Sequence, residues 1–135
     1  MLLDSLRDES GRVMVKYHPE AIRQVISPYT ARKVTEALKT VVGEGGTARH
    51  AKLEYYSVAG KTGTAQKPGR GGDISGKFYS SFVGFFPADK PVLCIFVGLD
   101  EPTGDYYGGL TAAPIFKAIA KRTASYLGIP PDQCP

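Results

Sequence analysis

The chain has 135 residues, of which 42% are hydrophobic, and this is enough for one ordinary globular domain with its own core. Its 17 basic and 13 acidic residues give a net charge of +4 without a block of like charges, which argues against nucleic-acid binding and is compatible with a surface that faces anionic envelope polymers. No apolar run is long enough to span a bilayer, and the apolar start of the chain meets Asp4 at once, so we expect no anchor and no signal peptide in this chain.

Histidine and cysteine usage does not indicate a metal site. The two histidines, His18 and His50, stand outside any metal-ligand pattern. Cys94 lies within the apolar run 92–97, which predicts a buried apolar role, whereas Cys134 lies in the tail. The spacing of the two cysteines does not require a disulfide. We therefore expect no metal and no cofactor.

The first part of the chain predicts an extended lead-in over residues 1–26, followed by a helix over 27–43. Within the lead-in, residues 2–6 and 12–15 fit the strands of a hairpin around the turn sequence DESG, and a short extended piece follows at 24–26. The helix begins with serine at the N-cap and proline at the first position, continues with apolar residues at helical spacing, and can close at a glycine.

A sheet is predicted over residues 55–99. Its first strand covers 55–65, and the second covers 78–86, where side chains alternate between two faces. The third, 92–99, is apolar nearly throughout, which is typical of a central strand covered on both faces. Because the connections are short, we expect an antiparallel sheet in the order 55–65, 78–86, 92–99.

The remaining segments are predicted as loops and a last helix. Thr47, in the loop that precedes the sheet, is interpreted as a cap or turn hydroxyl, and the glycine-rich stretch 66–76 as a mobile loop. The helix covers 111–128 and has Pro114 in its first turn. We expect it to pack on one face of the sheet. Its predicted buried stripe is Ile115, Phe116, Ile119, Ala120, Thr123 and Leu127. The fold class is α+β, an antiparallel sheet with flanking helices.

The chemistry of the chain is concentrated in residues 57–66, SVAGKTGTAQ. Lys61, Thr62 and Thr64 supply a cation and two hydroxyls on a strand, and such an open edge suits the carboxylate end of an extended peptide. Gly63 removes a side chain where another backbone can lie close. A P-loop is excluded, because Tyr55 replaces its first glycine and the sequence after residue 63 is a poor helix start.

The longer run 58–66, VAGKTGTAQ, closely resembles the Lys-Thr-Gly element of the monofunctional class B penicillin-binding proteins, the transpeptidases of cell division and elongation. Further segments resemble that family in the family's order: 23–27, 46–48, 81–89, 106–109, 112–116 and 126–130. The resemblance implies that residues 1–135 are the C-terminal segment of a transpeptidase domain, with part of the fold shared by penicillin-binding proteins and serine β-lactamases.

The resemblance also implies roles for individual residues. In the family, the serine of S-x-x-K attacks a D-alanyl-D-alanine stem peptide of peptidoglycan, and β-lactams imitate that peptide end. Lys61 would bring positive charge to the substrate carboxylate, and the hydroxyls of Thr62 and Thr64 would bind it. The backbone N–H of Thr64 would donate to the oxyanion, and Gly63 would let the substrate lie along the strand.

Two of the family's three signature elements are missing from this sequence. None of its serines has lysine three residues later, and it contains no asparagine for S-x-N. The chain is therefore either a truncated reading frame or a piece of a longer protein. The function that the resemblance favours is that of one part of a peptidoglycan D,D-transpeptidase domain, to which this chain supplies the Lys-Thr-Gly strand. The alternative is a non-catalytic penicillin- or peptide-binding module or a truncated pseudo-enzyme.

The partners implied by the resemblance are stem peptides, β-lactams, the remainder of the transpeptidase domain and proteins of the division or elongation machinery, with no nucleic acid. The implied location is the cell envelope, at the extracytoplasmic face of the cytoplasmic membrane.

Overall fold

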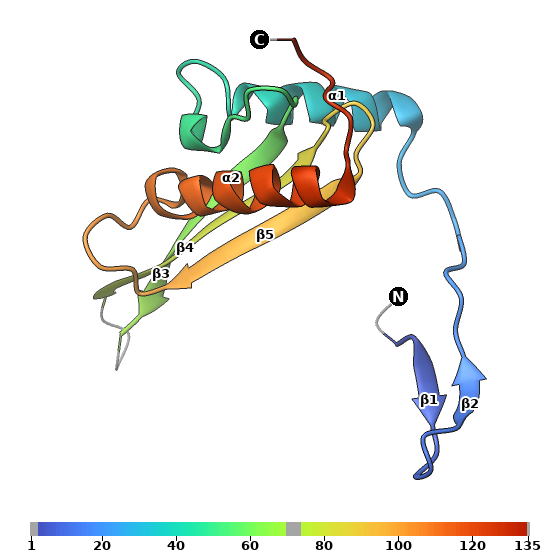
Figure 1. Cartoon of the computed structure of the whole chain (residues 1–135). Coiled ribbons are helices and arrows are strands. Elements are labelled where there is room, and N and C mark those ends of the chain that lie inside the picture. The colour runs from blue at the N-terminus through green and yellow to red at the C-terminus, as the bar shows by residue number, and fades with distance from the viewer. Residues whose placement is uncertain (1–2, 70–73, 135) are drawn as a thin grey trace.

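The computed structural model describes residues 3–69 and 74–134, and its helices and antiparallel strands confirm the α+β class (Figure 1). In chain order the elements are β1 (Ser5–Arg7), β2 (Val13–Lys16), α1 (Pro28–Thr40), the 3-10 turn η1 (Arg49–Ala51), β3 (Ala59–Pro68), β4 (Ile74–Phe86), β5 (Leu93–Asp100) and α2 (Gly108–Leu127). Within these described ranges, neither helix combines the length and the apolar character that crossing a membrane requires.

The three long strands form one antiparallel sheet in the predicted order, β3-β4-β5. Lys61 of β3 is paired with Val83 of β4, which in turn is paired with Phe96 of β5. β4 is therefore the central strand. In the described part of the chain β3 pairs only with β4, so the strand that carries Lys-Thr-Gly has a free edge.

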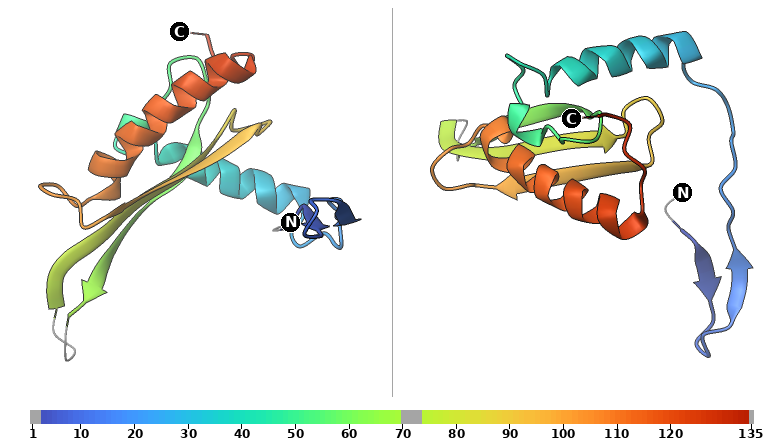
Figure 2. Two further views of the ribbon diagram at one scale, coloured as in Figure 1. Left: turned by 60° about the horizontal axis from the view of Figure 1, so that its bottom comes forward. Right: turned by 45° about the horizontal axis from the view of Figure 1, so that its top comes forward.

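The two helices lie on opposite sides of the sheet, with α1 near the end where β3 begins (Figure 2). α2 covers the face to which alternate residues of β4 point, and the alternation predicted for 78–86 is confirmed: Phe82 and Phe86 are fully buried, whereas Val83 is 39% exposed. Phe116 of α2 packs edge-on against both rings, with centroid distances of 4.9 Å to Phe82 and 6.5 Å to Phe86. These three rings form the centre of the core.

The prediction that residues 92–99 form a central strand covered on both faces is wrong. β5 lies at the edge of the described sheet, and Val97 is buried towards α2 while Phe96 is 62% exposed. The predicted buried role of Cys94 is wrong for the same reason, because its side chain shares the exposed face. Although the run is apolar throughout, its side chains alternate between a buried and an exposed face. Both Cys94 and Cys134 are exposed free thiols.

The predicted buried stripe of the last helix is also partly wrong. Phe116 and Ala120 are buried, but Ile115, Ile119 and Leu127 are 39%, 41% and 53% exposed. The buried residues of α2 are small apart from the one phenylalanine: Gly108, Gly109, Ala112, Ala113, Phe116, Ala120 and Ala124. Small side chains let the helix lie close to the sheet, so the alanine face packs inward and the bulkier residues lie outside it.

Several element boundaries differ from those predicted. α1 ends at Thr40, β3 begins at Ala59, and no strand forms at 24–26. The stretch 66–76 includes the paired ends of β3 and β4, since backbone pairing continues through polar and glycine residues; residues 70–73 of that predicted loop lie outside the described residues. α2 begins three residues early, so Pro114 lies in its second turn.

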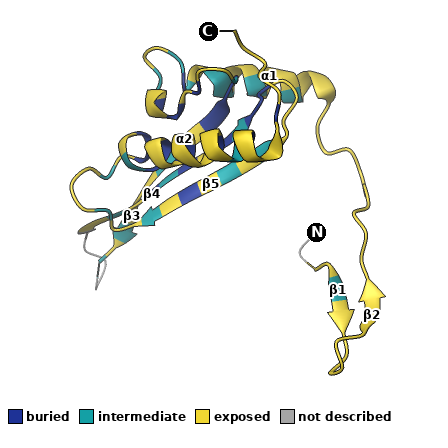
Figure 3. Ribbon diagram, viewed as in Figure 1, coloured by how far each residue is buried: buried dark blue, intermediate teal, exposed yellow. Residues whose placement is uncertain are grey.

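The predicted hairpin is confirmed, and β1 pairs antiparallel with β2. Asp8 organises its turn by accepting hydrogen bonds from the Ser10 hydroxyl and from the backbone N–H groups of Arg12 and Ser10, and these bonds lower the pKa of the Asp8 carboxyl. The hairpin is exposed along nearly its whole length (Figure 3). It therefore adds little to the core of the described chain.

The C-terminal tail fastens the segment that leads into β3. Asp132 accepts a hydrogen bond from the Ser57 backbone N–H at 2.7 Å and another from the Ser57 hydroxyl, which itself accepts from the Ala88 N–H at 2.8 Å. The Tyr56 hydroxyl donates to the Ile129 carbonyl oxygen at 2.7 Å. Because Ser57 is only 8% exposed, the carboxylate satisfies donors that water reaches poorly.

We expect Asp132→Ala to lower the free energy of unfolding by about 1–3 kcal/mol, because it leaves a nearly buried amide and hydroxyl without their acceptor. Urea denaturation followed by circular dichroism measures the change. Asp105→Ala is the matched control, since this exposed aspartate has no described partner. Equal losses in the two variants would contradict the assignment of the Asp132 contact.

Candidate functional site

The predicted site residues lie next to one another on β3, at the free edge of the sheet. Lys61 and Thr64 are exposed, and Thr62 and Gly63 are half-buried. The side chains of Thr62 and Thr64 reach the N-terminal turn of α2, so alternation directs Lys61 to the opposite face of the strand. The structure thus brings the four residues together, and the roles assigned to them stay predictions.

The Lys61 ammonium is available to an incoming anion. Its Nζ donates to the Thr62 carbonyl oxygen at 2.9 Å, and it forms no ion pair with a described carboxylate. An ammonium group has three donors and no acceptor, so two of its N–H groups remain for a ligand.

Gly63 has a packing role in addition to the one predicted. A Cβ atom at this position would lie 2.5 Å from the Ser81 Oγ on β4, so any side chain here would force Ser81 to rotate. The glycine therefore keeps the surface of the Lys-Thr-Gly strand flat.

Sequence reasoning missed the contact that Thr47 makes. Its Oγ1 lies 3.2 Å from the Oγ1 of Thr62, in a hydrogen bond that either hydroxyl can donate. The interpretation of Thr47 as a cap or turn hydroxyl is wrong, because its partner is the threonine of Lys-Thr-Gly. The resemblance of residues 46–48 to the family was the signal that could have indicated this.

The N-terminal turn of α2 reaches the site because it begins with two glycines. A Cβ at Gly108 would lie 2.2 Å from the Ser81 carbonyl oxygen and 2.6 Å from that of Gly63, and a Cβ at Gly109 would lie 1.8 Å from the carbonyl oxygen of Thr47. These neighbours are backbone atoms that cannot rotate away, so no side chain fits. The close approach lets the Gly108 N–H donate to Thr64 Oγ1 at 3.3 Å.

Aromatic residues cluster beside the first half of β4. Phe78 stacks on Tyr106 with ring centroids 4.1 Å apart, and Tyr106 contacts Tyr107 at 4.5 Å. The Ser80 hydroxyl donates to the Tyr106 carbonyl oxygen, which ties this segment to the sheet. The hydrogen bond between the two tyrosine hydroxyls raises the pKa of Tyr106.

Ion pairs connect the ends of the three strands beyond the site. Lys67 pairs with Asp100 and, at 3.0 Å, with Glu101, and Lys77 pairs with Glu101 at 2.7 Å. Hydrogen bonds from Lys77, and to a smaller extent from Lys67, hold the pKa of Glu101 below its ordinary value. The hydrogen bonds that Lys67 donates to Asp100, and to a smaller extent to Glu101, raise the pKa of Lys67. These exposed pairs help to fix the end of β3.

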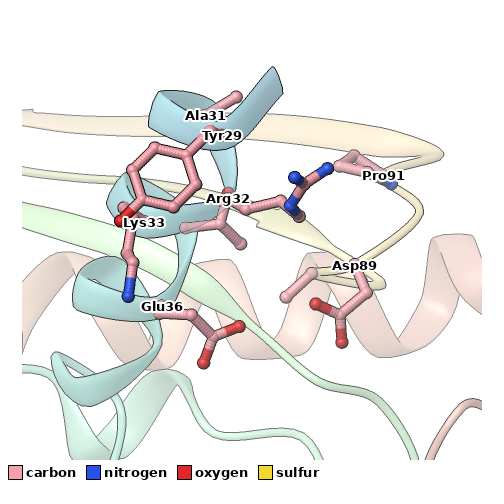
Figure 4. Close-up of a pocket in the computed structure, with 9 residues that line it drawn as sticks. Tyr29, Ala31, Arg32, Lys33, Glu36, Asp89 and Pro91 are labelled. Atoms are coloured by element: carbon pink, nitrogen blue, oxygen red, sulfur yellow. The ribbon is translucent and has the colours of Figure 1, made fainter. Parts of the chain in front are cut away.

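A separate pocket of about 490 Å³ lies between α1 and the turn that joins β4 to β5 (Figure 4). Tyr29, Arg32 and Glu36 from the helix face Asp89 and Pro91 from the turn. Lys39 joins the two elements by pairing with Glu36 at 2.8 Å and Asp89 at 2.7 Å. None of residues 61–64 lines this pocket, so the candidate site stays on β3.

The sequence matches the family described as "Penicillin binding protein transpeptidase domain" over residues 2–121. Stage V sporulation protein D of Bacillus subtilis (strain 168) is 43% identical over 121 residues, which cover 89% of this chain and 19% of that protein. The probable peptidoglycan D,D-transpeptidase PenA of Neisseria flavescens is 38% identical over 112 residues, which cover 82% of this chain and 28% of that protein. The chain thus spans between 19% and 28% of the length of these relatives.

Solved structures show the same fold. The apo transpeptidase domain of Burkholderia pseudomallei penicillin-binding protein 3 superposes with a TM-score of 0.73 at 42% identity, covering 83% of this chain and 34% of that one. Penicillin-binding protein 3 of Mycobacterium tuberculosis, complexed with ampicillin, gives a TM-score of 0.79 at 31% identity and covers 98% of this chain and 31% of that one.

The resemblance first seen around Lys-Thr-Gly therefore extends over most of the sequence and over the arrangement of its sheet and helices. On this evidence the chain belongs to the family of penicillin-binding protein transpeptidase domains.

Proposed function

We propose that this chain supplies the Lys-Thr-Gly strand, which binds substrate and stabilises the oxyanion, to a peptidoglycan D,D-transpeptidase domain that cross-links stem peptides through a serine acyl-enzyme. The observation that carries the proposal is the free edge of β3, where the Lys61 ammonium has no described carboxylate partner and bonds to the backbone carbonyl of Thr62. In this proposal residues 1–135 are the C-terminal segment of that domain.

An extended peptide can add to such a free edge, because backbone hydrogen bonds align it while side chains and its terminal carboxylate provide specificity. The D-alanyl-D-alanine end of a stem peptide, or a β-lactam, would place its carboxylate at the hydroxyls of Thr62 and Thr64. The Lys61 ammonium would attract that charge, and the flat surface at Gly63 would let the peptide approach.

The chemical step requires groups from outside this chain. The Thr64 backbone N–H would donate to the oxyanion that forms when a serine attacks the penultimate D-alanine carbonyl. The serine and its lysine would come from the remainder of the transpeptidase domain. The terminal D-alanine would leave as the acyl-enzyme forms, and an amine from a neighbouring strand of peptidoglycan would then attack the acyl-enzyme and release the serine.

The proposed setting follows from the same family. Curated relatives include peptidoglycan D,D-transpeptidases and a sporulation protein, and this agrees with a place in the cell envelope. We place the site at the extracytoplasmic face of the cytoplasmic membrane. Proteins of the division or elongation machinery are the proposed protein partners.

A chimera tests the proposal. This chain replaces the matching segment in a transpeptidase domain of the family that retains its S-x-x-K serine, for which the 42%-identical Burkholderia pseudomallei domain is suitable. We expect fluorescent penicillin to label the chimera stoichiometrically. A chimera that folds with an unchanged Tm but is not labelled would overturn the proposal and favour a non-catalytic binding module.

A further inference from the structure

Both threonine hydroxyls of the proposed site are contacted from outside their own strand. Thr62 is contacted by the hydroxyl of Thr47, from the loop before η1, and Thr64 by the backbone N–H of Gly108, from the first turn of α2. The backbone of Gly109 packs directly against that of Thr47, so the loop, the strand and the helix end form one unit.

The contact at Thr64 occupies one lone pair of its hydroxyl and leaves the proton for a ligand. A hydroxyl has one proton to donate and lone pairs that accept. Thr64 Oγ1 accepts the Gly108 N–H at 3.3 Å, and no described residue accepts the Thr64 proton. Because the side chain is exposed, this proton is available to a ligand that can only accept.

The contact at Thr62 leads to the same result once a carboxylate is present. A carboxylate accepts hydrogen bonds and donates none. When it lies in front of Thr62, the threonine must donate to it, and the Thr47 hydroxyl at 3.2 Å must then donate to Thr62. The chain of donors from Thr47 to Thr62 to the ligand strengthens each hydrogen bond in it.

The end of α2 adds a further preference for negative charge. The helix has 20 residues, its N-cap Tyr107 makes no side-chain capping bond, and its first N–H points at Thr64. The N-terminus of a helix carries a partial positive charge that acts over its first turn. Because Gly108 and Gly109 have no side chains, this positively charged helix end lies close to β3.

We infer that Thr47 and the Gly108–Gly109 turn are positioning elements that hold Thr62 and Thr64 ready to donate to a ligand, and that they thereby favour a ligand with a free carboxylate over one with a terminal amide. This inference rests on the proposed function and extends it to residues outside Lys-Thr-Gly. A carboxylate offers two charged acceptor oxygens to these donors, whereas a terminal amide offers one neutral acceptor, so the amide would bind less well.

The test is an NMR titration of the complete 135-residue chain, labelled with ¹⁵N, with N-acetyl-D-alanyl-D-alanine and with its C-terminal amide. We follow the backbone signals of residues 62–64 and 108–109. The wild-type chain is expected to bind the carboxylate weakly and the amide more weakly still. Thr47→Val should lower the affinity for the carboxylate about fivefold to tenfold and leave that for the amide unchanged, since one charge-assisted hydrogen bond is weakened.

Further variants separate positioning from folding. Thr47 is exposed, so Thr47→Val is expected to keep the Tm, and Thr47→Ala is a second variant with the same expected loss. Thr47→Ser keeps the hydroxyl and should restore carboxylate binding. Thr40→Val is the control, because among the described residues the Thr40 hydroxyl bonds only to the Ala37 carbonyl oxygen of its own helix.

The outcomes distinguish this inference from the proposed function. A wild-type chain that shows no preference for the carboxylate would overturn both. A wild-type chain that prefers the carboxylate, with a preference that survives in Thr47→Val and Thr47→Ala, would overturn the inference alone.

Discussion

Lys61→Ala is expected to lower the rate of acylation by a β-lactam roughly 10²–10³-fold in the chimera that carries an S-x-x-K serine. The Lys61 side chain leaves β3 on the face opposite the threonine side chains, and its exposed ammonium makes a single described hydrogen bond, to the Thr62 carbonyl oxygen. Its charge is therefore free to stabilise the substrate carboxylate and the anion that develops during attack. The rate of labelling by fluorescent penicillin at several concentrations measures the loss.

Stability should change far less than the rate, because Lys61 is exposed and forms no ion pair with a described residue. Lys90→Ala, at an exposed lysine in the turn between β4 and β5, is the control for loss of one positive charge, and its labelling rate should match that of the unmodified chimera. A Lys61→Ala chimera that acylates at the normal rate would remove Lys61 from the site.

Much of the fold could be predicted because its signals are local. The N-cap at Ser27 is a property of adjacent residues, and its hydroxyl indeed accepts the N–H of Thr30 at 3.1 Å. The two-residue alternation of 78–86 predicted that β4 has two different faces, and the structure shows that the face of Phe82 and Phe86 is the buried one. Turn residues between strands likewise fixed the antiparallel order, since short connections leave few other arrangements.

Burial was less predictable, because it depends on what lies beside an element and not on its own composition. The apolar run 92–97 suits a central strand as well as an edge strand, and the exposed Cys94 and Phe96 show which one it is here. In α2, the sequence predicts that the face with the largest side chains is the core face. The alanine face is buried instead because a flat helix surface fits closely on the sheet.

The candidate site likewise has a part that could be predicted from the sequence and a part that could not. Residues 61–64 could be identified because they form one contiguous motif. The contacts of Thr47 and Gly108 could not, since each crosses a long stretch of sequence to reach its threonine, 15 residues in one case and 44 in the other. Only the tertiary arrangement of loop, strand and helix brings those groups to the hydroxyls.

The chain on its own is expected to form no covalent adduct with a β-lactam and to show no transpeptidase activity. Acylation needs an activated nucleophile beside the oxyanion donors. The Ser57 hydroxyl is held by Asp132, and the fully buried Ser80 donates to the Tyr106 carbonyl oxygen, so neither is available. Ser81 lies beside Gly63, but the Lys61 ammonium bonds to the Thr62 carbonyl oxygen and does not activate it.

Intact-mass spectrometry after incubation with fluorescent penicillin measures this directly, and the labelled chimera is the positive control. The same sample should self-associate in size-exclusion chromatography with light scattering, because large apolar side chains such as Ile22, Val92 and Phe96 are 90%, 60% and 62% exposed. A stoichiometric mass shift at one serine would show that the chain carries its own nucleophile. The Lys-Thr-Gly strand would then act together with a catalytic serine that lies outside any S-x-x-K motif. The assignment of the nucleophilic serine and its lysine to the remainder of a transpeptidase domain would be wrong.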